Sequence, residues 1–87
     1  MRTTKLIPGH FYSFCDRGEV HIGQYIGRQR GFECCVCRKG TNAYTFNLWN
    51  SERDYETWGF GPAHMPRIWE DFGKPKDDGV IIDRYYN

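Results

Sequence analysis

The sequence has no long hydrophobic run, and no apolar stretch approaches the roughly 18 residues that a membrane-spanning helix needs. Its first residues, Met1 to Gly9, have a charged start but no apolar segment behind it, so they lack the pattern of a secretory signal. We therefore expect a cytoplasmic protein with no membrane partner. In that compartment cysteines serve as thiols or metal ligands rather than as disulfides.

An excess of one charge sign is also missing, since 12 Lys and Arg oppose 11 Asp and Glu for a net charge of +1. Residues 1–44 hold seven basic and three acidic residues, and residues 45–87 hold five and eight. A general nucleic-acid binder is usually more basic, because phosphate neutralisation supplies much of its affinity. The balance therefore argues against general nucleic-acid binding and leaves a local basic site as the route to it.

Catalytic signatures are absent as well. The chain contains no P-loop, dinucleotide-binding fingerprint, G-x-S-x-G or H-E-x-x-H motif. With 87 residues, it is short for building both a deep pocket and a core. We expect a non-enzymatic domain with no catalytic residues and with no cofactor unless its cysteines bind zinc.

Aromatic residues are abundant: three Trp, six Tyr and six Phe make up 17% of the chain. Each aromatic side chain buries a large area, so a small core is feasible at this length. So many aromatics with so little net charge are not typical of a disordered chain. The sequence predicts a single domain over residues 1–87.

The first half of the chain carries the signals of short β-strands. Val20, Ile22 and Ile26 alternate with polar or small residues, and a period of two is typical of a strand. Gly23 inside that segment indicates a bulge or a close backbone approach. We expect a β core over 8–49, with strands at 10–15, 20–26, 32–38 and 43–49 and turns at 16–18, 27–31 and 40–42.

The second half has an aromatic-rich insertion, residues 50–79. Its composition predicts one short helix starting at Ser51 and a second over 67–72, with a closing strand at 80–85. Strand number and spacing resemble SH3-like small β-barrels. The resemblance implies a mainly β fold, either such a barrel or a strongly bent antiparallel sheet of about five strands, with one or two short helical turns within 50–73. It carries no function with it.

The cysteines offer one candidate metal site. Cys34 and Cys37 form a C-x-x-C pair, which is a common zinc-binding arrangement. The stretch 32–46 resembles the first half of a zinc ribbon, but no second pair follows. The remaining two ligands would come from Cys15, His10, His21 or His64. Cys15 and His21, which we expect on adjacent strands, are the best spaced of these. The alternative is that Cys34 is a buried thiol in the core.

Residues 54–72 form the first candidate binding surface, because they hold more apolar side chains than a long loop needs. Trp, Tyr, Met and Arg are enriched at interface hot spots, and Trp58 and Trp69 are the expected anchors. Part of this set would instead complete the core. Flanking carboxylates favour a basic partner. The candidate protein-binding residues are Tyr55, Trp58, Phe60, Met65, Arg67 and Trp69.

A second candidate surface combines basic turns with tyrosines. On a small barrel, aromatic rings beside basic loops stack and neutralise single-stranded nucleic acid. The alternative is a set of solvated loops with half-buried tyrosines. The candidate nucleic-acid-binding residues are Tyr25, Arg28, Arg30, Arg38, Lys39 and Tyr44.

We therefore expect a small protein-binding domain that occupies a surface of a larger intracellular protein. Small phage or mobile-element genomes encode accessory proteins of this size as inhibitors of host machinery. Two alternatives stand beside it: a small β-barrel that binds single-stranded nucleic acid, and a zinc-stabilised interaction domain. The sequence leaves the oligomeric state open.

Overall fold

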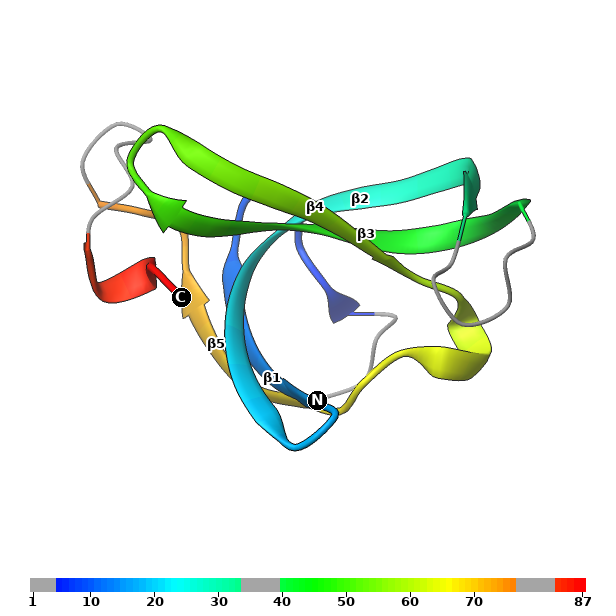
Figure 1. Cartoon of the computed structure of the whole chain (residues 1–87), viewed down its shortest axis with the longest axis horizontal. Coiled ribbons are helices and arrows are strands. Elements are labelled where there is room, and N and C mark those ends of the chain that lie inside the picture. The colour runs from blue at the N-terminus through cyan, green and yellow to red at the C-terminus, as the bar shows by residue number, and fades with distance from the viewer. Residues whose placement is uncertain (1–4, 34–39, 77–82) are drawn as a thin grey trace.

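The computed structural model describes residues 5–33, 40–76 and 83–87, which form one open antiparallel sheet (Figure 1). Its strand order is β4-β3-β2-β1-β5. The mainly β fold with about five antiparallel strands is confirmed. The elements are β1 (Phe11–Asp16), β2 (Glu19–Glu33), β3 (Gly40–Ser51), β4 (Asp54–Phe60) and β5 (Ile68–Gly73), with two 3₁₀ turns, η2 (Pro62–His64) and η3 (Asp83–Tyr85).

The turn predicted at 27–31 is wrong, because β2 continues through it to Glu33. Its pairing with β3 has register shifts between Tyr25 and Gly27 and between Gln29 and Phe32. The glycines therefore bend a continuous strand instead of reversing the chain. Residues 40–42, predicted as a loop, belong to β3. Most of the strand predicted at 32–38 lies outside the described residues.

Both predicted helices are wrong. Residues 52 and 53 form the turn of the β3–β4 hairpin, so Ser51 ends a strand instead of starting a helix. Residues 68–73 form β5, whose pairing with β1 supplies a ladder that local sequence does not reveal. One helical turn does lie within 50–73, but it is η2, at neither predicted position. Residues 83–85 of the predicted closing strand form η3, and 80–82 lie outside the described residues.

Three phenylalanines from three strands form the centre of the core. The ring centroids of Phe14 on β1, Phe46 on β3 and Phe60 on β4 lie 5.3 to 6.1 Å from one another. Between β1 and β3 lies Gly23 of β2, which has no side chain to separate them. A Cβ there would lie 3.1 Å from Phe46 Cβ and 3.2 Å from Phe14 Cε1. A close approach is one of the two alternatives that the sequence predicts at this glycine, and the groups that approach it are side chains of β1 and β3.

The sheet is strongly bent, because β1 and β4 meet across the core although β2 and β3 separate them in the sheet. A straight strand with the 15 residues of β2 would be about 46 Å long. The longest dimension of the molecule is 36 Å. In Figure 1, β3 and β4 cross above β1 and β5, and β2 curves from one group to the other.

A second apolar cluster lies on the opposite face of the sheet from the three phenylalanines. Phe11 of β1 stacks on Tyr85 of η3 at 4.1 Å, and Ile22, Trp49, Phe72 and Tyr86 pack around them. Next to this cluster Asn87 bridges β2 and β3. Its side-chain amide donates to the Ile22 and Trp49 carbonyls and accepts from the Ile22 N–H, while its own N–H donates to the Trp49 carbonyl.

The packing at Gly23 predicts that Gly23→Ala destabilises the fold. The added methyl group would press on side chains of β1 and β3, and overpacking of this kind costs about 1–3 kcal/mol. Urea denaturation measures the effect. Val20→Ala, at an exposed position of the same strand, serves as the control and should change stability by less than about 0.5 kcal/mol. Equal or higher stability of Gly23→Ala would contradict the close packing.

Burial of Tyr25 predicts a loss of stability at alkaline pH. Desolvation raises the pKa of its phenol above 10.0, although the Arg28 charge partly offsets this. Above pH 10 the unfolded chain releases this proton while the folded chain retains it, so stability falls as pH rises. We expect the urea midpoint of the wild type to fall between pH 9 and pH 11 more than that of Tyr25→Phe. Identical pH profiles for the two proteins would rule this contribution out.

Candidate functional site

The structure has a pocket of about 400 Å³ at one end of the curved sheet. Three separate segments line it: the β1–β2 turn, the far end of β2, and the second half of β4. The bend of the sheet brings them together. The lining residues are Asp16, Arg17, Phe32, Thr57, Trp58, Gly59 and Phe60.

Contacts on several sides hold the Trp58 ring in place. Its indole N–H donates to a carboxylate oxygen of Glu56 at 3.0 Å. Its ring centroid lies 4.8 Å from that of His21 and 6.3 Å from that of Phe60, both in edge-to-face geometry. Trp58 is half-buried, so the pocket presents a large apolar surface that is already ordered.

Phe32 forms a second aromatic wall, and its position depends on Gly59. A Cβ at Gly59 would collide with the Phe32 ring, so only glycine lets the ring lie on the β4 backbone. Phe32 lies at the end of the long strand β2, and Gly59 is the second-last residue of β4. Their contact therefore joins the ends of two strands that are not neighbours in the sheet.

The β1–β2 hairpin supplies both charges that line the pocket, Asp16 at the end of β1 and Arg17 in the turn. Asp16 and Glu19 pair at the base of the hairpin, and the two residues between them have positive φ, 53° at Arg17 and 81° at Gly18. This geometry suits the right-handed twist of a hairpin, but asparagine, aspartate or glycine is preferred at the first position. Arg17 is the one non-glycine residue with positive φ in the described ranges.

The candidate protein-binding residues do not form one patch. Tyr55 and Trp69 are 50% and 55% exposed, but they lie on β4 and β5, the two opposite edges of the sheet. Trp58 reaches the pocket, and Phe60 lines it while also packing in the core. The remaining two differ: Met65 is half-buried against the core, and Arg67 is exposed.

The candidate nucleic-acid-binding tyrosines lie in the core, with Tyr25 only 5% and Tyr44 only 8% exposed. The Arg28 guanidinium lies 4.0 Å from the Tyr44 ring centroid and donates two hydrogen bonds to the Asn42 carbonyl. Arg28 thus covers a ring that a base would need for stacking. Arg30 is exposed, and Arg38 and Lys39 lie outside the described residues.

The candidate metal ligands are only partly placed, because Cys34 and Cys37 lie outside the described residues. Cys15 and His21 do lie on adjacent strands, as predicted. However, Cys15 pairs with Val20 and His21 pairs with Phe14, so the two side chains point to opposite faces of the sheet. Over the ranges that the structure describes, no three His, Cys, Asp or Glu side chains gather in a group able to hold a metal ion.

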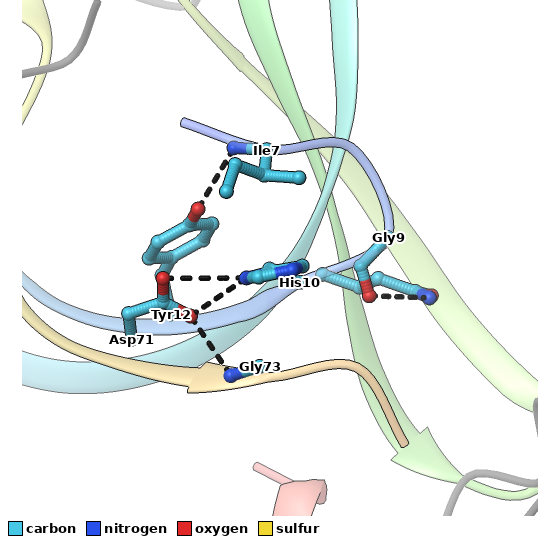
Figure 2. A network of polar contacts seen from close by, with 7 residues as sticks. Ile7, Gly9, His10, Tyr12, Asp71 and Gly73 are labelled. Atoms are coloured by element: carbon cyan, nitrogen blue, oxygen red, sulfur yellow. Dashed lines mark hydrogen bonds and ion pairs between the residues drawn. The ribbon is translucent and has the colours of Figure 1, made fainter. Parts of the chain in front are cut away.

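A polar network links the N-terminal segment to β1 and β5 (Figure 2). The His10 Nδ1 lies 3.0 and 3.2 Å from the two carboxylate oxygens of Asp71. That carboxylate also accepts from the Gly73 N–H, and the Tyr12 hydroxyl accepts from the Ile7 N–H. In Figure 2 these contacts join the chain before β1 to the β5 edge, which is a structural role.

Sequence reasoning missed five lining residues of the pocket: Asp16, Arg17, Phe32, Thr57 and Gly59. Of these five residues, only Arg17 had a local signal in the sequence, because arginine is unusual at the first position of a two-residue hairpin turn. Comparison with protein-family models, curated proteins and solved structures finds no match for this chain. Within the described part of the chain, no helix has the length and hydropathy that a membrane crossing requires.

The turn geometry predicts that Arg17→Asn stabilises the protein. Asparagine adopts positive φ at a lower cost than arginine, so we expect a gain of about 0.5–1 kcal/mol in the free energy of unfolding. Thermal and urea denaturation measure it. Arg30→Asn, at an exposed position with ordinary φ, should give no gain. A stability loss in Arg17→Asn would show that the arginine side chain makes a compensating contact.

Proposed function

We propose that this protein is a non-enzymatic protein-binding domain that docks on a larger intracellular protein through the pocket at Trp58. The observation that carries the proposal is the ordered aromatic pocket lined by Phe32, Trp58 and Phe60. A volume of about 400 Å³ lies in the range of small ligand sites and suits one long side chain of a partner. Buried tryptophan anchors are typical of interface hot spots.

The finer fold we propose is SH3-like. Five antiparallel strands in one strongly bent sheet support it, and so does the contact between β1 and β4 across the core. Association of the β4 and β5 edges would complete a barrel. In such a scaffold the pocket lies between a hairpin turn and an edge strand, where a partner segment has access to it.

The matched tryptophans Trp58 and Trp69 test the docking surface. Purified wild-type protein, Trp58→Ala and Trp69→Ala would be immobilised, exposed to nuclease-treated lysate, and compared by quantitative mass spectrometry. We expect a stoichiometric partner that the wild type and Trp69→Ala retain and Trp58→Ala loses, because truncating a hot-spot anchor costs at least about 2 kcal/mol of binding. Circular dichroism would verify that each variant is folded.

Two results would contradict the proposal. A partner that depends on Trp69 and not on Trp58 would move the interface to the β5 edge. Loss of all retained material after nuclease treatment would favour nucleic-acid binding. If Trp58→Ala fails to fold, Trp58→Phe preserves the ring and should retain the partner with reduced affinity.

A further inference from the structure

We infer that the pocket receives a cationic side chain, lysine or arginine, from the partner, with the cation over the Trp58 ring and Asp16 as its counter-charge. This inference rests on the proposed function and names the chemistry that the site recognises. It needs a ring face that attracts positive charge, a carboxylate without a partner of its own, and room for a long side chain.

The ring requirement is met by Trp58. Tryptophan presents the most negative π-face of the aromatic side chains, and cations within about 6 Å of a ring centroid are attracted to it. The Glu56 carboxylate accepts from the indole N–H at 3.0 Å, which adds negative potential beside the ring and fixes its orientation. Phe32 supplies a second ring in the same pocket.

The chain's own cations leave this position open. Arg28 stacks on Tyr44 at 4.0 Å and Arg84 lies 5.1 Å from the Tyr85 ring centroid. Among the described residues, however, no lysine or arginine stacks on Trp58. Two aromatic rings of the chain, those of Tyr44 and Tyr85, thus make cation–π contacts with its own arginines. Trp58, whose ring attracts cations more strongly than tyrosine does, lines the pocket without such a contact among the described residues.

The charge requirement is met by Asp16. Its carboxylate lines the pocket and is half-buried, and no hydrogen bond or ion pair engages it within the described ranges. A half-buried carboxylate gains more from an opposite charge than an exposed one, because solvent screens it less. Glu56, and Glu19 3.9 Å from His21, add further negative charge nearby.

Arg17 provides the opposing charge at the pocket. Its guanidinium would repel an incoming cation, so it lowers the affinity of the site rather than creating it. A weaker but more selective site results, since only a side chain that reaches both Trp58 and Asp16 offsets the repulsion. Removing this charge should therefore strengthen cation binding.

Two probes of matched size and shape test the inference: N-acetyl-arginine amide and N-acetyl-citrulline amide, in which a neutral urea replaces the guanidinium. Titration of the full chain is followed by ¹H–¹⁵N NMR at the Trp58 indole and the Gly59 amide. We expect the arginine probe to bind roughly tenfold more tightly than the citrulline probe, a difference within the range of cation–π and ion-pair interactions.

Variants assign the interaction to its residues. Asp16→Asn should lower the affinity for the arginine probe roughly fivefold and leave the affinity for the citrulline probe unchanged. Arg17→Asn should raise the affinity for the arginine probe roughly two- to threefold. Trp58→Ala, followed at the Gly59 amide, should abolish the response. Trp69→Ala, the matched control on the β5 edge, should leave it intact. N-acetyl-lysine amide should behave as the arginine probe does.

Equal binding of the arginine and citrulline probes would overturn the inference. If Trp58→Ala still loses a protein partner in that case, the proposed function stands and the pocket takes a neutral side chain. If neither the partner nor the probe depends on Trp58, the proposed function fails as well. If a short oligothymidine shifts the same resonances more strongly than the arginine probe, the pocket binds a nucleobase and not a cationic side chain.

Discussion

The packing of Phe14, Phe46 and Phe60 above Gly23 is the constraint on which the rest of the structure depends. Phe14 and Phe46 belong to strands on either side of β2, so they meet only where β2 has no side chain. Their contact with Phe60 draws β4 over β1 and bends the whole sheet. The same bend brings the β1–β2 turn beside β4, and the pocket is its consequence. The core and the pocket therefore depend on the same packing contacts, because the chain is too short to build them separately.

The sequence predicts those features of the fold that local pattern determines. Aromatic content locates β1, alternation locates β3, and Gly23 marks the close approach. Pattern could not decide whether Gly27 and Gly31 reverse a strand or bend it, because that depends on pairing with β3. The local pattern could not identify β5 either. Residues 68–73 are compatible with a short helix, and only their pairing with β1 makes them a strand. The faces of β2 show the same limit: Val20 and Ile26 are exposed while Tyr25 is buried.

For the site, sequence reasoning found Trp58 because a surplus of aromatics in one segment is visible locally. It missed the partners of Trp58 because Asp16, Arg17 and Phe32 come from segments that only the curvature of the sheet unites. Tyrosine was ambiguous for a different reason. Its ring suits a core and its hydroxyl suits a surface, so Tyr25 and Tyr44 fit a stacking platform until their burial is known. Predicting such a site requires the bend of the sheet as well as the strands.

The Asn87 bridge has a consequence for how the protein opens. The Ile22 amide hydrogen is held by the Asn87 side chain, so it exchanges with solvent once Asn87 detaches from the sheet. Amides in the ladder between β2 and β3 exchange only when the sheet itself separates. The exchange rate at Ile22 thus reports the release of one anchoring residue, and comparison with its neighbours separates this local release from global unfolding.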